Sequence, residues 1–476
     1  MDTDTHTSRR REKGALIVGF VSLAAAVLLA HGSPPETYEL SIYAGTPVAF
    51  WVGTSIALLV GVFVGLRADG VRGRLALVLA GVAMFAVASL PVVRSYYFFG
   101  AGDSLTHLGW AKDIAAGKLS VLNFLYPGTH TVAVILSDVT GMGLPRAMLV
   151  MVSAFTAVFL LFVPLTTWTI TRDRRATTLA ALAALLFLPL NNVSVFDMPH
   201  PTTQAIMFLP LILYLAARYL VRADREGLFV GTPTGALMAI TSMAVVLVHP
   251  QQAANVLVVF GSILGLQLLA RLVGSRETDH RTLALQTVFL AGVFAVWAPR
   301  HERATGATSA LLGMLSSGFR FGQETTQAAG SVSAVGGSLQ MLFAKLFLVS
   351  VVFCALAGVS VLGGLLGRFE DAPDVRSFSR YLGLALVPLF GLFTAYFIVS
   401  YEKLHFRQLG FIMVLVTILG AVALARGMDA LSTRFSPGTR GGWWASRSWS
   451  CSRCRSRRST SRRTCTRAPA TSPRPR

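Results

Sequence analysis

Long apolar runs recur along this chain, separated by short polar connections. A helix needs about 17 to 25 apolar residues to cross a lipid bilayer, and most of the runs reach that length. The pattern predicts an all-α fold, a polytopic transmembrane helical bundle of about 12 spans, with 11 to 13 as the range. The predicted spans are residues 14–30, 47–66, 75–93, 146–171, 176–190, 203–221, 233–248, 251–272, 283–299, 339–366, 381–400 and 409–425.

Composition supports the same class. Hydrophobic residues make up 53% of the 476 residues and charged residues only 13%, whereas soluble domains carry about 25% charged residues. The mean hydropathy is +0.61. A soluble fold, an intrinsically disordered chain and a disulfide-stabilised scaffold are therefore excluded.

Basic residues mark one side of the predicted bundle. Arg9–Arg11 and Lys13 precede the first span, and every second connection then carries arginines, within residues 67–74, 172–175, 218–225, 271–281 and 368–380. Short loops rich in Lys and Arg face the cytoplasm. The pattern predicts a multi-pass protein of the cell membrane with both termini cytoplasmic. Residues 128–142 are apolar but short and contain Asp138, so we expect a half-inserted or juxtamembrane helix on the outer side.

Four regions follow from this organisation. Residues 1–93 form an N-terminal anchor and a helical hairpin, residues 94–145 the first large outer loop, and residues 146–435 the main bundle. Residues 436–476 form a basic tail. Residues 437–476 hold eleven of the twenty net positive charges and lack Asp, Glu, Leu, Ile, Val, Phe and Met, so disorder is expected. The tail either binds anionic lipid or, as we favour, is the product of a frameshift.

Candidate chemistry gathers on the predicted outer side. Loop 94–127 places Gly100 and Gly102 before Asp103, and an amphipathic helix is expected from Ser104, with Asp103 or Ser104 as its cap. Asp103 and His107 are four residues apart and so share one helical face. Leu105, Leu108, Ala111, Ile114 and Ala115 supply an apolar stripe. Seven of the nine histidines lie on this side: His31, His107, His130, His200, His249, His301 and His405.

Other outer connections add polar groups. Loop 191–202 contains Asp197 and His200, and His249 is followed by Pro250, Gln251 and Gln252. Loop 300–338 begins with Arg300, His301, Glu302 and Arg303 and becomes rich in Gly, Ala and Ser, which is typical of a flexible lid. Residues 401–408 supply Lys403, His405 and Arg407. The alternative for the arginines is that they only reach toward lipid headgroups.

The first outer loop resembles the membrane-embedded GT-C glycosyltransferases. Asp103 opens a short amphipathic helix, Ala115-Ala116-Gly117-Lys118 follows, and Tyr126-Pro127 leads into an apolar helix that ends at a glycine. The resemblance covers roughly residues 94–200. Three features depart from the family: Gly128 stands where many relatives have a second proline, the loop follows the third span rather than the first, and there is no Asp-x-Asp metal pair.

The resemblance implies a reaction and a set of site residues. The donor is a sugar carried on a polyprenyl phosphate such as dolichyl phosphate, and the acceptor is a glycan, lipid or protein. Asp103 would act as the base or orienting group, with His107 as its catalytic neighbour. No metal ligands are assigned, and a divalent cation stays an open alternative as cofactor. Candidate substrate-binding residues are Lys118, Tyr126, His200, His249, Arg300, Arg303, His405 and Arg407, with Lys403 a further basic candidate by position.

The chemistry agrees with these residue types. Displacing a polyprenyl phosphate needs positive charge on the departing phosphate, for which arginine is suited, and a carboxylate to take the proton of the attacking hydroxyl. The sequence has no Gly-rich loop for a nucleotide and no feature of a nucleic-acid partner. The alternatives are a transporter or flippase of lipid-linked sugars, a polysaccharide polymerase or ligase, and a non-enzymatic scaffold. A transporter should carry polar groups near mid-bilayer, where the predicted spans have almost none except Lys345.

Overall fold

The computed structural model describes residues 2–221, 232–274, 280–302, 338–369, 372–399 and 404–435, with residues 305, 306, 309 and 313. The chain divides into two compact units, Met1–Met428 and Asp429–Arg476, and the candidate site lies in the first. The predicted tail, most of the expected lid in loop 300–338, and Arg303 and Lys403 lie outside the described residues.

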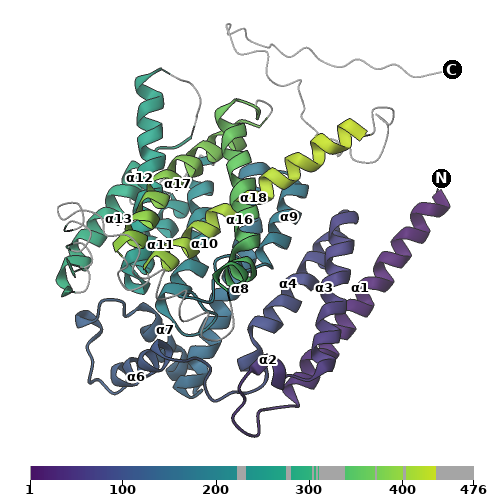
Figure 1. Ribbon diagram of the computed structural model, residues 1–476, viewed down its shortest axis with the longest axis horizontal. Coiled ribbons are helices and arrows are strands. Elements are labelled where there is room, and N and C mark those ends of the chain that lie inside the picture. Colours follow the sequence, from purple (N-terminus) through teal and green to yellow (C-terminus); the bar gives the residue numbers. More distant parts are fainter. Residues whose placement is uncertain are drawn as a thin grey trace, which may run out of the picture. The chain divides into compact units, whose positions relative to one another are not determined.

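Every regular element in the described ranges is a helix (Figure 1). In chain order these are α1 (Asp2–His31), α2 (Ile42–Gly45), α3 (Val48–Arg67), α4 (Val71–Ala88), α5 (Leu90–Val93), α6 (Asp103–Ala115), η1 (Val121–Asn123), α7 (Gly128–Thr140), α8 (Leu144–Thr171), α9 (Arg174–Ala184), α10 (Pro201–Val221), α11 (Pro233–Val248), α12 (Pro250–Leu272), α13 (Ala284–Trp297), η2 (Ala298–Arg300), α16 (Leu339–Leu365), α17 (Pro373–Val399) and α18 (Leu404–Phe435).

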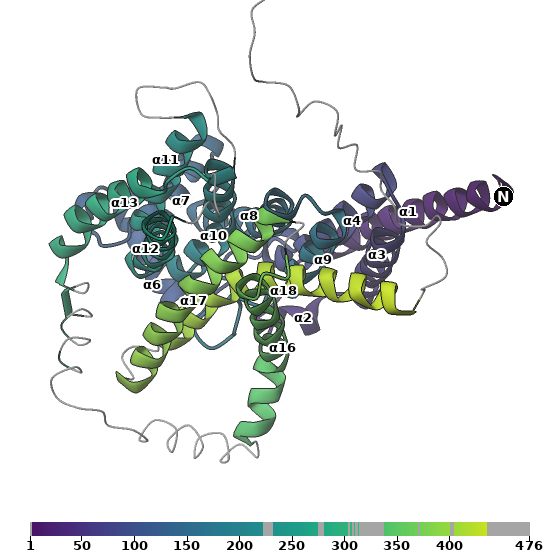
Figure 2. The ribbon, with the colours of Figure 1, turned by 90° about the horizontal axis from the view of Figure 1, so that it is seen from above.

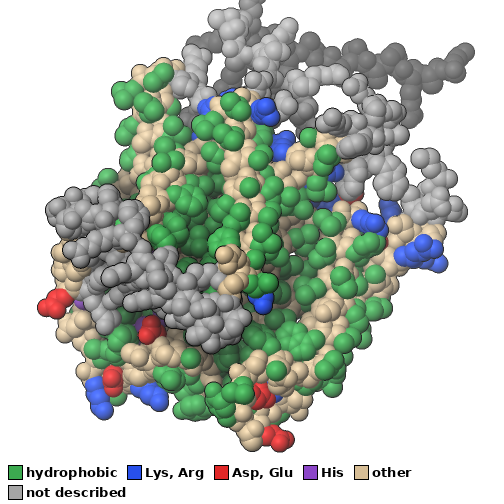
Figure 3. Space-filling view, viewed as in Figure 1, with side chains coloured by type: hydrophobic (Ala, Val, Ile, Leu, Met, Phe, Trp, Pro, Cys, Tyr) green, Lys and Arg blue, Asp and Glu red, His purple; other side chains and the backbone are tan. Residues whose placement is uncertain are grey.

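Within the described residues, nine helices are long and apolar enough to cross a membrane: α1, α3, α4, α8, α10, α12, α16, α17 and α18. Two shorter apolar helices, Pro233–Val248 and Ala284–Arg300, match two more predicted spans. In the space-filling view, hydrophobic side chains cover most of the wall between the helix ends (Figure 3). The protein is therefore a multi-pass helical membrane protein, with fewer long helices in the described ranges than the twelve predicted spans.

The predicted span 176–190 is not one helix. Helix α9 ends at Ala184, and Phe187 and Asn192 have left-handed backbone, with φ of 44° and 54°. Pro189 cannot donate a backbone hydrogen bond, so it cannot continue the helix. Asn191 then replaces the missing backbone pairing, because its Oδ1 accepts from the N–H groups of Val193, Ser194 and Val195 at 3.0 to 3.2 Å. Apolarity alone could not reveal this break.

The short helix expected at 128–142 is present as α7. Its C-cap is Gly141, as predicted, and this residue has left-handed backbone with φ 71°, which glycine adopts readily. At 1.5 Å per residue its 13 residues span about 20 Å, less than the roughly 30 Å hydrocarbon core of a bilayer. Helix α7 packs against α6, α8 and α11. Its length fits the predicted half-inserted or juxtamembrane helix.

Arginines gather at the helix ends that lie away from α6 and α7. Helices α8, α10 and α12 begin on the α7 side and end near Arg172, Arg218 and Arg271. Arg174 pairs with Asp69 between α3 and α4, and the N–H of Arg281 donates to Leu220 at the end of α10. The alternation of basic connections along the sequence thus corresponds to one basic end of the described helices.

Helices α1, α3 and α4 lie side by side (Figures 1 and 2) and enclose a separate hydrophobic cluster. At the end of this group, Arg94 is 2% exposed. Its Nη1 and Nη2 donate to the two carboxylate oxygens of Glu39 at 2.6 and 2.7 Å, and its Nε donates to the Ser33 carbonyl at 3.0 Å. These hydrogen bonds hold the pKa of Glu39 below its ordinary value. Arg94 therefore ties loop 32–41 to the start of the loop that carries the site.

Replacing Arg94 with Met should destabilise the protein by about 2 kcal/mol, because the Glu39 carboxylate and the Ser33 carbonyl lose their charged partner. Thermal unfolding followed by circular dichroism in detergent measures the effect. Glu36→Gln, which changes an exposed acid in the same loop, is the matched control and should leave the midpoint unchanged. An equal midpoint for Arg94→Met and the parent would contradict this role.

Candidate functional site

Four histidines that are far apart in the sequence meet at one end of the main bundle. His107 lies on α6, His130 on α7, His200 directly before α10 and His249 between α11 and α12. His107 Nδ1 and His130 Nε2 are 3.0 Å apart, and the His107 and His200 rings are 5.7 Å apart. Tyr126 stacks on His249 with ring centroids 5.9 Å apart. The structure thus brings His107, Tyr126, His200 and His249 together, and we call these residues with His130 the histidine cluster.

Prolines position three members of the histidine cluster. Tyr126, His200 and His249 each directly precede a proline that opens a helix: Pro127, Pro201 and Pro250. A residue before proline is held away from helical backbone, and proline is favoured at the first turn of a helix. His249 accordingly adopts extended backbone, with φ −162° and ψ 107°, and ends α11. Each side chain is therefore presented at a helix start.

The start of α6 differs from the expectation. Gly102, with φ 55°, is the N-cap, and no side chain caps the helix, so neither Asp103 nor Ser104 has the predicted capping role. Asp103 is the first helical residue, and its carboxylate is 74% exposed. Within the expected apolar stripe, Leu108 and Ala111 are buried and Leu105 is 57% exposed, and the neighbouring Ser104 is fully buried.

Asp103 reaches His200 rather than His107. Its Oδ2 lies 3.8 Å from His200 Nε2, within ion-pair distance. The backbone of His200 is itself held, because its N–H donates to Gln204 Oε1 at 2.9 Å and Gln204 Nε2 donates to Met198 at 3.0 Å. An exposed carboxylate thus stands over a buried imidazole whose position is fixed by the first turn of α10.

Burial keeps the inner histidines uncharged. It lowers the pKa of His130 to about 4 and that of His200 to about 4, and it lowers the pKa of His249 well below its ordinary value. The positive charge of Arg407 adds to the lowering for His200 and His249. At neutral pH each of these rings therefore offers one donor and one acceptor.

Arg407, on α18, faces this group with its charge uncompensated by a carboxylate. Its Nε donates to Ser194 Oγ at 3.3 Å, and within the described ranges no Asp or Glu lies at ion-pair distance from it. The side chain is half-buried. A half-buried arginine without an acid beside it is suited to an anionic ligand.

Several buried polar atoms near the histidine cluster lack partners. Among the described residues, these include Nδ1 of His200, Nδ1 of His249, Nε2 of Gln252 and Oε1 of Gln408. Buried polar groups in proteins nearly always pair, and exceptions point to water or a ligand. His200 and His249 are each more than nine-tenths buried, and both glutamines are fully buried. The sequence shows Gln252 beside His249 and Gln408 in the 401–408 connection, but neither glutamine was predicted to bind substrate.

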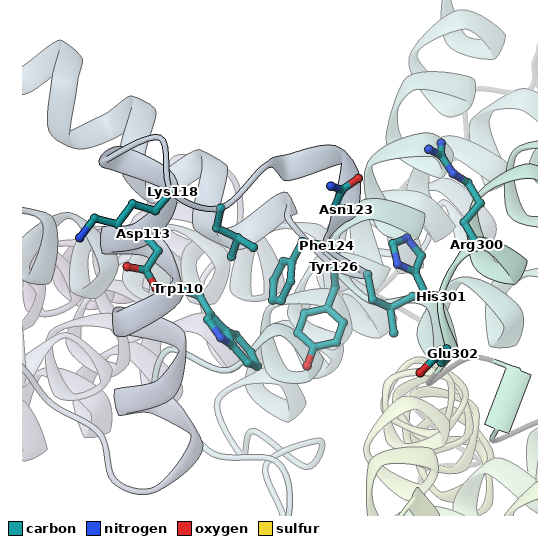
Figure 4. Close-up of a pocket in the computed structure, with 11 residues that line it drawn as sticks. Trp110, Asp113, Lys118, Asn123, Phe124, Tyr126, Arg300, His301 and Glu302 are labelled. Atoms are coloured by element: carbon teal, nitrogen blue, oxygen red, sulfur yellow. The ribbon is translucent and has the colours of Figure 1, made fainter.

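The remaining predicted residues lie elsewhere. Lys118 and Arg300 line a neighbouring pocket together with His301 and Glu302, and Tyr126 of the histidine cluster also lines it (Figure 4). His405 lies among the rings of Phe393, Phe397 and Phe406. Arg303 and Lys403 fall outside the described residues. In the part of the chain that the structure describes, no three His, Cys, Asp or Glu side chains gather as metal ligands.

Asp197 is a buried acid for which no role was predicted from the sequence. Burial raises its pKa to about 6, and Thr156 Oγ1 lies 3.2 Å from its Oδ1. The signal in the sequence is an acid between apolar residues, Val195-Phe196 before it and Met198-Pro199 after it, without a basic neighbour. An acid in such surroundings favours the neutral form.

Comparison with known proteins assigns this chain to no family. No protein-family model matches it, and no curated protein matches it. The interpretation of the site therefore depends on its own geometry and on the resemblance of the first outer loop.

The histidine cluster should make the protein sensitive to mild acid. The unfolded chain binds protons to His130, His200 and His249 below about pH 6.5. In the folded state the pKa values of His130 and His200 are about 4, and that of His249 is well below its ordinary value. Stability should therefore fall as the pH is lowered from 7 to 5. Asp197 opposes this fall below about pH 6, because its folded pKa is raised.

Thermal midpoints at pH 7.0, 6.0 and 5.0 measure the effect, with a fall of several degrees expected. His200→Gln should reduce the fall and Asp197→Asn should enlarge it. A midpoint that stays constant or rises toward pH 5 would contradict the assignment of buried neutral histidines.

Proposed function

We propose that this chain is a GT-C-type glycosyltransferase that moves a sugar from a polyprenyl phosphate, of the dolichyl type, to an acceptor at the outer face of the cell membrane. The observation that carries the proposal is Arg407, a half-buried cation with no carboxylate at ion-pair distance among the described residues, beside His200 and His249 with their unpartnered nitrogens. With the basic ends of the helices in the cytoplasm, both termini would be cytoplasmic and the histidine cluster would face outward.

In the proposed reaction, Asp103 acts on the acceptor and Arg407 acts on the donor phosphate. The oxygen of an acceptor hydroxyl attacks the anomeric carbon of the donor sugar, and its proton passes to the exposed carboxylate of Asp103. The bond between the anomeric carbon and the phosphate oxygen breaks, and its electron pair leaves with the polyprenyl phosphate. Arg407 stabilises the negative charge that develops there. His200, 3.8 Å from Asp103, lies between the carboxylate and the cation.

The neutral state of the buried histidines supports these separate roles of Asp103 as proton acceptor and Arg407 as the cation for the phosphate. An uncharged imidazole donates one hydrogen bond to a phosphate oxygen without competing for the proton that Asp103 takes. His107 then orients the ring network through His130 and His200. The apolar wall of the bundle suits the isoprenoid chain, which needs no polar contact.

A polysaccharide polymerase or ligase is the alternative activity within the same class of enzymes. Such an enzyme uses the same kind of donor, and only the acceptor distinguishes it from a transferase. A flippase is less favoured, because the unpartnered polar atoms of His200, His249 and Gln408 lie at or before the starts of α10, α12 and α18 rather than at mid-helix.

Asp103→Asn should lower sugar transfer by about 100-fold or more, because the amide cannot accept the proton. Transfer of radiolabelled sugar from dolichyl-phosphate mannose and dolichyl-phosphate glucose in proteoliposomes measures it, with expression and insertion checked in parallel. Asp138→Asn, an exposed acid on α7, is the matched control and should retain the parent rate. A fully active Asp103→Asn enzyme would remove the catalytic assignment, and lipid-linked sugar crossing the bilayer without transfer would favour the flippase.

Arg407→Ala should raise the donor concentration needed for half-maximal transfer by about tenfold or more, because the departing phosphate loses its cation. Arg407→Lys should recover part of the loss, since it keeps the charge but not the planar fork. The donor dependence of the initial rate in the same proteoliposomes distinguishes the three proteins. If all three respond alike, the phosphate binds elsewhere.

A further inference from the structure

A pocket of about 610 Å³ opens beside the histidine cluster, on the other side of its aromatic residues. Figure 4 shows it between the segment that follows α6 and the segment that follows α13. Pockets that take small molecules measure about 300 to 1,000 Å³. Trp297 Nε1 donates to the Leu125 carbonyl at 2.8 Å, and this bond joins the end of α13 to the segment that follows α6.

Three aromatic rings form one wall. Trp110, Phe124 and Tyr126 follow one another, with ring centroids 4.8 Å apart between Trp110 and Phe124 and 5.0 Å between Phe124 and Tyr126. The rings are inclined at 60° to 66° to each other, and each is only partly buried. The face of an aromatic ring is negative and accepts weakly polar C–H groups. Such a wall suits a ligand that has flat C–H surfaces.

Among the described residues, the rim of the pocket carries as many acids as bases. Asp113 and Glu302 supply two carboxylates, and Lys118 and Arg300 supply two cations, with Asn123 between them in the close-up (Figure 4). Burial and the neighbouring Arg300 lower the pKa of His301, so this ring is neutral. A rim without net charge does not favour a phosphate. Its carboxylates, amide and cations instead offer acceptors and donors for hydroxyl groups.

We infer that this pocket binds a neutral carbohydrate, whose C–H faces pack on Trp110, Phe124 and Tyr126 and whose hydroxyls bond to Asp113 and Asn123. If the proposed function holds, this carbohydrate is the acceptor. The wall adjoins the histidine cluster. The ring centroids of Trp110 and His107 are 5.2 Å apart, and the Tyr126 ring stacks on the His249 ring. A sugar on this wall would thus lie next to the histidine cluster, whose residues are assigned to transfer.

Isothermal titration calorimetry of the full chain, in a detergent without a sugar headgroup, tests the inference. The probes are maltose, cellobiose, lactose and methyl α-mannoside, with inorganic phosphate and an acidic hexapeptide as charged alternatives. At least one saccharide should bind, with an affinity at least about tenfold higher than that of phosphate or the peptide. Binding of the peptide or phosphate in preference to every saccharide would overturn the inference, as would the absence of saccharide binding.

Matched variants locate the binding. Trp110→Ala and Asp113→Ala should each weaken the best saccharide by about tenfold or more, whereas Trp110→Phe, which keeps an aromatic face, should recover most of the affinity. Asp138→Ala, outside the pocket, should bind like the parent. Equal affinities for all four variants would place the saccharide elsewhere and overturn the inference.

The two proposals fail separately. Saccharide binding is measured without donor, so it persists if the chain proves not to transfer sugar. Conversely, transfer to an acceptor that lacks carbohydrate, unaffected by Asp113→Ala, would leave the transferase proposal standing and remove the carbohydrate pocket.

Discussion

The structure depends on one requirement, that polar backbone inside an apolar bundle must find hydrogen-bond partners. The chain between α9 and α10 is irregular, and Asn191 meets this requirement there by accepting from three backbone N–H groups. Its Nδ2 also donates to the Phe406 carbonyl at 2.8 Å. Unpaired backbone at such a place would cost several kcal/mol per group. The same bonds set Arg407, the next residue on α18, against Ser194.

The polar groups near Asn191 comprise an acid, a set of neutral histidines and a cation, each in a different position. The carboxylate of Asp103 is exposed, His130, His200 and His249 are neutral, and the half-buried Arg407 guanidinium has no acid at ion-pair distance among the described residues. If a carboxylate paired with Arg407, the positive charge would be neutralised within the protein and would not attract an anionic ligand. The arrangement leaves a cation and several unpartnered nitrogens available together, which is the property that the proposed donor phosphate requires.

The neighbouring pocket has the opposite electrostatic character. Its described lining holds two acids and two bases, and its wall consists of aromatic rings rather than buried imidazoles. Because Tyr126 belongs to both the pocket and the histidine cluster, the two regions are adjacent without sharing charge. The proposed lipid phosphate and the proposed carbohydrate would therefore bind side by side at one end of the protein.

The sequence by itself determined the helical membrane class, the basic end of the helices and the gathering of His107, His200 and His249 at the other end, because apolar length and charge alternation act locally along the chain. The Tyr126-Pro127, His200-Pro201 and His249-Pro250 pairs also mark helix starts from local backbone restriction alone. Only the tertiary structure decided that Asp103 meets His200 rather than His107 and that the 176–190 segment breaks. The first outcome depends on which side chains of distant helices come within range of each other, which no local pattern encodes. The break forms locally, at Phe187 and Pro189, but apolar length alone does not reveal it.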